Sequence, residues 1–139
     1  MRIQTAIVVP VSIEEQITTS PPMETVASSP SVPNFVITRK GYGTITYKSP
    51  VDLSDIPTLS ALKEVIQIER GLISLYKKST MPSPGNGINV PAEILLEGIR
   101  PPPDFEPEEF QEELQNKENT QFISYDAETG NYMYTVEHF

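Results

Sequence analysis

Short runs of β-branched and aromatic residues recur along the chain and predict a protein built mostly from β-strands. Residues 35–38 and 44–47 are rich in Val, Ile, Thr and aromatic side chains, which pack well on a pleated sheet. The segment between them carries a glycine on each side of Tyr42, which fits a tight bend with positive φ. These residues therefore predict a strand pair joined by a turn.

Further runs of this kind predict five more strands, and the last two form a hairpin. They cover residues 65–68, 72–76, 92–97, 122–126 and 132–137. Because successive side chains of a strand point to opposite faces, Tyr132, Tyr134 and Val136 would share one face. The turn before them contains Gly130, as hairpin turns often do.

Helical signals are few and short. Residues 60–64 predict one helical turn, and the Pro- and Gly-rich residues 81–89 predict a loop. An acidic block at residues 104–118 places Phe110 and Leu114 four residues apart. That spacing predicts a helix with one narrow apolar stripe and a solvated acidic face.

The chain divides into three parts by composition. Residues 1–17 predict a short strand and a helical turn that belong to the domain. Eleven of the seventeen residues from 18 to 34 are Ser, Thr or Pro, which predicts a flexible linker or loop over residues 18–33. Residues 34–139 predict the main folded domain.

Composition excludes several kinds of chemistry. The chain has 139 residues, one histidine and no cysteine, so it fits one domain and cannot hold disulfides, thiol catalysts or multi-His metal sites. No cofactor or metal is predicted. No apolar run is long enough for a membrane span or a signal segment, so no membrane partner is expected. A net charge of −9 disfavours broad binding to phosphate backbones.

The polar motifs taken singly give little evidence of catalysis. His138 lies one residue from the end, where chains usually fray, and no triad partner stands near it in sequence. The glycines at residues 85–87 lack the Gly-Lys-Ser/Thr ending of a phosphate loop. Arg39 and Lys40 beside Tyr42 fit a nucleic-acid surface, but they equally fit strand-end charges that discourage edge pairing.

Seven short motifs, read in order, resemble one family. They are Arg39-Lys40-Gly41-Tyr42-Gly43, Val51-Asp52-Leu53, Gly85-Asn86-Gly87-Ile88-Asn89, Pro91-Ala92-Glu93-Ile94, Tyr125-Asp126, Thr129-Gly130 and Val136-Glu137-His138-Phe139. Their order, spacing and His-Phe ending resemble the C-terminal autoproteolytic domain of the GLFG-repeat nucleoporins, and more closely its budding-yeast forms. The resemblance covers residues 34–139.

The resemblance implies an α+β fold, in which a six-stranded, mostly antiparallel sheet forms a partly open barrel flanked by short helices. It implies self-cleavage after His138-Phe139, with the hydroxyl of a following Ser or Thr as nucleophile and His138 as its helper. It also implies docking to a β-propeller scaffold nucleoporin, or to a downstream peptide released by the cleavage.

The implied role is structural. The domain would dock a GLFG-repeat nucleoporin onto scaffold nucleoporins of the nuclear pore complex in the nucleus, supporting mRNA export and protein import, and would act as a monomer. The residues expected to contact a partner are Arg39, Lys40, Tyr42, Tyr132, Tyr134 and Phe139.

Two departures from the family pattern shape the expected activity. The sequence ends at Phe139, without the nucleophile, so we expect no enzyme activity and a vestigial or post-cleavage His138. No Phe-Gly repeat is present. A self-cleaving serine-type autoprotease domain and an RNA-binding module remain the alternatives. RNA would bind near Tyr42 and Tyr76, and the charge of −9 predicts weak binding or none.

Overall fold

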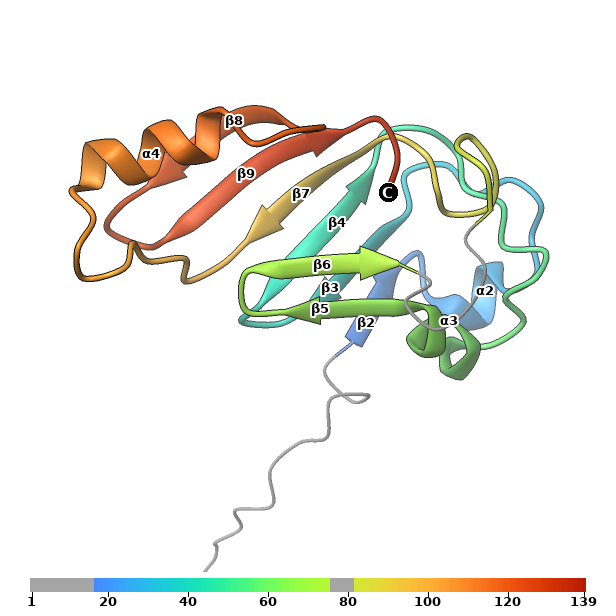
Figure 1. Ribbon diagram of the computed structural model, residues 1–139. Helices are drawn as coiled ribbons and strands as arrows, with labels where there is room; N and C mark the ends of the chain where they lie inside the picture. The colour runs from blue at the N-terminus through green and yellow to red at the C-terminus, as the bar shows by residue number, and fades with distance from the viewer. Residues whose placement is uncertain (1–16, 76–81) are drawn as a thin grey trace, which may run out of the picture.

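The fold is centred on one six-stranded antiparallel sheet (Figure 1). The computed structural model describes residues 17–75 and 82–139. Across the sheet the strands are β2 (Ile17–Ser20), β3 (Val36–Arg39), β4 (Gly43–Tyr47), β7 (Ala92–Leu96), β9 (Asn131–Val136) and β8 (Gln121–Asp126). The sheet is open, with β2 and β8 at its edges, and the predicted α+β class is confirmed.

A second layer covers one face of this sheet. It consists of the hairpin β5 (Ile66–Glu69) and β6 (Leu72–Leu75) with the helices α2 (Met23–Val26), α3 (Leu59–Val65) and α4 (Pro107–Gln115). The hairpin crosses in front of β3 and β4, and α4 lies along β8 and β9 (Figure 1). Among the described residues, no helix is long and apolar enough to cross a membrane.

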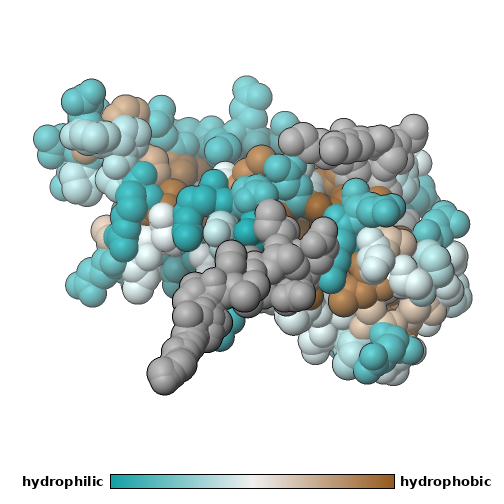
Figure 2. Space-filling view, turned by 90° about the horizontal axis from the view of Figure 1, so that it is seen from below, coloured by the Kyte–Doolittle hydropathy of each residue, from teal (hydrophilic) through white to brown (hydrophobic). Residues whose placement is uncertain are grey.

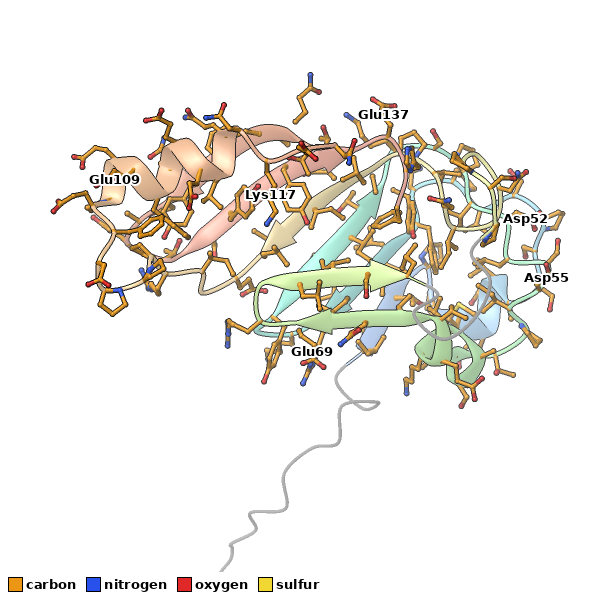
Figure 3. All side chains as sticks on the ribbon, in the orientation of Figure 1. Asp52, Asp55, Glu69, Glu109, Lys117 and Glu137 are labelled. Carbon is orange, nitrogen blue, oxygen red and sulfur yellow. The ribbon has the colours of Figure 1, made fainter. Side chains whose placement is uncertain are left out.

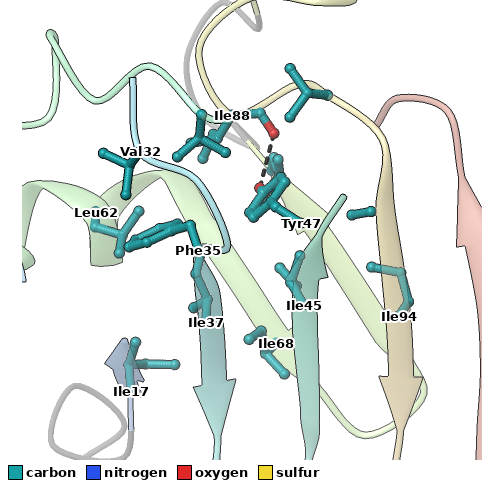
Figure 4. Packing of buried hydrophobic residues seen from close by; sticks show 14 of the residues in the cluster. Ile17, Val32, Phe35, Ile37, Ile45, Tyr47, Leu62, Ile68, Ile88 and Ile94 are labelled. Atoms are coloured by element: carbon teal, nitrogen blue, oxygen red, sulfur yellow. Dashed lines mark hydrogen bonds between the residues drawn. The ribbon is translucent and has the colours of Figure 1, made fainter. Parts of the chain in front are cut away.

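The core lies between the sheet and this second layer. Alternate residues of the central strands, among them Ile37, Ile45 and Ile94, point toward the hairpin and are buried (Figure 4). Phe35 and Leu62 extend the same cluster toward α3. Burying each such side chain stabilises the fold by about 1.5–3 kcal/mol relative to leaving it exposed.

The predicted strands and their turns agree with the structure. The last hairpin turns at Gly130, whose φ is +80°. A Cβ atom built there would lie 2.7 Å from the backbone nitrogen of Ile99, so only glycine fits. The predicted acidic helix is α4, which begins with Pro107 and buries Leu114.

The structure contradicts the prediction of a flexible linker at residues 18–33. β2 pairs with β3 along its whole length, and α2 follows it. Met23 and Val32 are 4% and 2% exposed, and Val32 exchanges backbone hydrogen bonds with Val51. A few large apolar residues spaced through a polar segment are enough to fix it to the core. The strand and helical turn predicted within residues 1–17 lie outside the described residues, except for Ile17.

Hydrophobic side chains also reach the surface beside α2 and α3. In the view from below, brown side chains gather on that side of the molecule (Figure 2). A pocket of about 450 Å³ opens there, lined by residues of β2, α2 and the start of α3, with Met23 and Leu59 among them.

Candidate functional site

The end of the chain is built into the fold. β9 lies between β7 and β8, with Val136 paired to Ala92 and Thr135 paired to Gln121. Three residues after β9 ends, the half-buried ring of Phe139 lies 6.1 Å from the ring of Tyr47, between centroids. The general tendency of chain ends to fray, noted for His138, therefore does not describe this terminus, and the predicted strand at residues 132–137 is confirmed.

Residues 82–89 also hold Phe139 in place. The backbone N–H of Phe139 donates to Oδ1 of Asn89 at 2.5 Å, and Nδ2 of Asn89 donates to the carbonyl of Pro82 at 2.8 Å. The hydroxyl of Tyr47 donates to the carbonyl of Ile88 at 2.9 Å (Figure 4). In the sequence, Asn89 belongs to a predicted loop and to one of the seven motifs, and neither indicates that it contacts the chain end.

An apolar pocket of about 230 Å³ opens between β6 and the chain end. It is lined by Ile73, Ser74, Leu75, Ile94, Asn119, Thr120, Tyr134, Val136, His138 and Phe139. We call it the terminal groove. The lining residues come from β6, β7, β9, the segment before β8 and the end of the chain.

Acidic side chains stand around the molecule and not in the terminal groove. Asp52, Asp55, Glu109 and Glu137 project outward from the ribbon (Figure 3), and none of them lines the groove. Among the described residues, no group of three His, Cys, Asp or Glu side chains is placed to hold a metal ion. The groove therefore suits an apolar segment better than a cation.

His138 is exposed and lies beside the main chain of Phe139. Its Nδ1 is 3.4 Å from the carbonyl oxygen of Phe139. It also borders a polar pocket of about 320 Å³ with Thr120, Thr135 and Glu137 among its lining residues. A neutral imidazole there can take a proton from a hydroxyl attacking the Phe139 carbonyl and return it to the leaving amine.

Tyr132 and Tyr134 share one face, as predicted, but they occupy different environments. Their ring centroids are 4.8 Å apart. Tyr132 is 2% exposed, and its hydroxyl donates to the carbonyl of Leu114 at 3.3 Å, so it belongs to the core. Tyr134 lines the terminal groove. Burial, with a smaller effect of Tyr132, raises the pKa of Tyr134 to about 12, and burial raises the pKa of Tyr132 as well.

Arg39 serves the fold. It is 4% exposed, and its Nη1 donates to the carbonyl of Ile68 at 2.7 Å and to Oε2 of Glu69 at 2.8 Å. Its guanidinium lies 3.6 Å from the ring centroid of Tyr42, and that of Arg70 lies 4.9 Å from it. These contacts fasten the β3–β4 turn to the β5–β6 hairpin. A partner could not reach Arg39 without opening this packing, so the expectation that Arg39 contacts a partner is corrected.

The predicted contact residues fall at two separate places. Lys40 is exposed beside the half-buried Tyr42, at the turn that precedes Gly43. Phe139 lies beside Tyr47, at the opposite end of β4. The structure thus brings Tyr134, His138 and Phe139 together and leaves Arg39, Lys40 and Tyr42 at the far turn. Tyr76, named for an RNA site, lies outside the described residues.

Comparison with known proteins assigns the family. The family model described as Nup98-96 autopeptidase S59 matches residues 15–139. The chain belongs to this family. The match confirms the resemblance seen in the motifs, and it begins at residue 15 instead of residue 34, so it includes β2 and α2.

Relatives and solved structures agree with this assignment. The chain is 32% identical to nucleoporin NUP116/NSP116 of Saccharomyces cerevisiae over 91% of its length, and 34% identical to nucleoporin NUP145 of Chaetomium thermophilum over 78%. It spans only 13% and 6% of those two proteins. The C-terminal domain of NUP116 from Candida glabrata matches 96% of both chains with a TM-score of 0.80 and 30% identity. A chain of the yeast heterotrimeric Nup82-Nup159-Nup116 nucleoporin complex matches 89% of this chain and 97% of its own length, with a TM-score of 0.79 and 32% identity.

Proposed function

We propose that this chain is a docking domain that holds a nucleoporin in the nuclear pore complex by binding other nucleoporins. Its role is structural, in the nucleus, and it supports mRNA export and protein import through the protein that it anchors. The observation that carries this proposal is the match over nearly the whole chain to a component of the Nup82-Nup159-Nup116 complex.

The terminal groove is the proposed contact. Its floor and walls are mostly apolar, through Ile73, Leu75, Ile94 and Val136. Such a groove takes an apolar side chain or a short extended segment, because burying that surface drives the association. The partner we propose is a scaffold nucleoporin of the Nup82 kind, with a β-propeller as the surface that presents this segment. A peptide from downstream of Phe139 is the other candidate occupant.

A binding experiment tests this proposal. The chain is immobilised and incubated with the purified yeast Nup82-Nup159 pair, and the same is done with a chain that lacks residues 138–139. We expect the full chain to retain the pair and the shortened chain to lose most of it, because two residues that line the groove are gone. Equal retention by both chains, or none by the full chain, would contradict the proposal.

Thermal unfolding separates loss of contact from loss of fold. Removing residues 138–139 leaves β9 complete but removes the contacts of Phe139 to Asn89 and Tyr47, so we expect a moderate fall in melting temperature. Removing residues 134–139 cuts β9, which lies inside the sheet, and should lower the melting temperature strongly as well as abolish binding.

Self-cleavage is the second candidate function, favoured by His138 lying beside the Phe139 carbonyl. In a chain that continues with Ser or Thr, the hydroxyl would attack the Phe139 carbonyl carbon. The peptide C–N bond would break as an ester forms, and the proton would pass through His138 to the new amine. Water would then hydrolyse the ester.

A version of the chain extended by Ser and a short tag tests this activity. We expect it to split after Phe139, and a His138→Ala version of the same extended chain to split much more slowly. Mass spectrometry identifies the new end. Intact extended chain after prolonged incubation would show that the domain is a docking module only.

A further inference from the structure

The motif at residues 85–89 has a structural role that its sequence did not reveal. The segment is folded back on itself: the N–H of Gly85 donates to the carbonyl of Asn89 at 2.8 Å, and the N–H of Asn89 donates to the carbonyl of Asn86 at 2.9 Å. The carbonyl of Gly87 accepts from the N–H of Asp52 at 3.1 Å, which connects the loop to the segment that contains Asp52. Asn89 is thereby held in one place before it meets the chain end.

Both polar atoms of the Asn89 side chain are engaged. Nδ2 donates to the carbonyl of Pro82, so Oδ1 is the atom that faces the N–H of Phe139. The residue is 2% exposed, so solvent cannot replace either hydrogen bond. The contact joins two residues that are fifty positions apart in sequence.

The same loop also holds the ring of Phe139. The carbonyl of Ile88 accepts from the hydroxyl of Tyr47, and the Tyr47 ring lies between the rings of Phe35 and Phe139, with centroid distances of 6.2 Å and 6.1 Å. Adjacent loop residues thus fix the main chain of Phe139 directly and its side chain through Tyr47. Two fixed points define the position of a residue that no strand pairing holds.

We propose that Asn89 is a positioning residue that sets the position of the main chain at Phe139 and so shapes the part of the terminal groove that Phe139 lines. It acts through Phe139, with no contact of its own to the occupant, since Asn89 does not line the groove. The part of this inference that concerns docking rests on the proposed function. The hydrogen bond itself can be tested without any partner.

Asparagine suits this place because the site needs an acceptor and a donor side by side in a buried environment. Leucine has a similar size and supplies neither, so the N–H of Phe139 and the carbonyl of Pro82 would both lose their partner. Aspartate keeps an oxygen toward Phe139, although it loses the donor to Pro82 and brings a carboxylate into the site. Asn86 offers a control in the same loop, because it is exposed and its Nδ2 donates to the exposed Ser83 Oγ at 2.9 Å, away from the chain end.

Amide hydrogen exchange measured by NMR tests the proposal on the chain as it is. In Asn89→Leu we expect exchange at the Phe139 amide to speed up about ten-fold relative to Asn86→Ala, since a buried hydrogen bond is lost. The amides of Ile37 and Ile45 should change far less. Unchanged exchange at the Phe139 amide would overturn the proposal, because Asn89 would then not hold that N–H. An equal rise at all three amides would also overturn it, because Asn89 would then stabilise the whole fold and not the position of Phe139.

Asn89→Asp keeps the experiment decisive if Asn89→Leu fails to fold. The remaining oxygen should hold the Phe139 amide within about three-fold of the parent rate. A ten-fold loss of protection at Phe139 in this variant would contradict the assigned role of Oδ1.

Binding to the Nup82-Nup159 pair tests whether the hydrogen bond matters for docking. Asn89→Leu should weaken binding in the full chain and have no further effect in the chain that lacks residues 138–139. Equal weakening in both chains would show that Asn89 acts independently of Phe139 and would overturn the proposal. If the parent chain does not bind the pair, the proposed function fails while the exchange experiment still decides the role of Asn89.

Discussion

The two halves of the core are built from different side chains. Beneath the β5–β6 hairpin and α3 the core is mostly aliphatic and closed to solvent, with Phe35, Ile37, Ile45 and Leu62 fully buried. Beneath α4 it is mostly aromatic, and a larger share of it is half-buried. Leu114 and Tyr132 are buried there, while Phe110, Phe122 and Tyr125 remain partly exposed.

The difference shows where stability and binding are located. In the closed half, a buried charged side chain needs an ion-pair or hydrogen-bond partner, and Arg39 has one in Glu69. In the aromatic half, the polar ends of the tyrosines reach backbone carbonyls, as Tyr125 does with Ile99 at 2.6 Å. The terminal groove lies where the two halves meet, between β6 and β9. We therefore expect substitutions in the closed half to affect folding and those at the groove to affect binding.

The largest expected effect is the loss of an aromatic ring from the closed half. Phe35→Ala should lower the free energy of unfolding by about 3–5 kcal/mol, because it leaves a cavity in a packed core. Phe122→Ala removes the same ring from the half-buried side and should cost about 1–2 kcal/mol. Urea unfolding of both variants measures the difference. Equal losses would show that the two halves are packed alike.

A smaller effect is expected from substitutions at the neighbouring residues Arg39 and Lys40. Arg39→Met removes the hydrogen bonds to Ile68 and Glu69, and we expect a loss of about 2 kcal/mol, moderated because the Glu69 side chain is 39% exposed and can be hydrated. Lys40→Met should stay within about 0.5 kcal/mol of the parent. The melting temperatures of the two variants measure this contrast, and similar values would refute the structural role given to Arg39.

A third effect is a dependence of stability on alkaline pH. The pKa of Tyr134 is raised by burial from 10.0 to about 12. The folded state therefore favours the neutral phenol, and this contribution is complete below pH 10.0 and is lost as pH rises toward 12. Urea unfolding across that range should show stability falling by up to about 1.4 kcal/mol per pH unit. Tyr134→Phe should have a flatter profile, and an equally steep one would assign the dependence elsewhere.

The sequence pattern predicts correctly the elements that form between residues close together in the chain. The strands around Gly43 and the hairpin at Gly130 follow from alternation and glycine turns, and α4 follows from the spacing of Phe110 and Leu114. β2 and α2 were missed because they are held in place by pairing with β3 and by isolated buried apolar residues such as Met23. Their own composition is that of a linker.

The site was only partly predictable for a similar reason. The motif order indicated His138 and Phe139, and the alternation indicated Tyr134. Asn89 could not be found, because its partner is fifty residues away and its burial exists only in the fold. Arg39 was expected to be exposed, since a charge at a strand end usually is. Its burial depends on the hairpin that supplies Glu69.

Calorimetric titration of the Nup82-Nup159 pair into groove variants tests the central claim most directly. Ser74 lines the terminal groove from β6, while Leu72 lies on the same strand, is 46% exposed and does not line it. Ser74→Arg should weaken binding by at least about ten-fold, or 1.4 kcal/mol, and Leu72→Arg should bind like the parent chain. Parent-like binding by Ser74→Arg, or equal weakening by both variants, would contradict docking through the terminal groove.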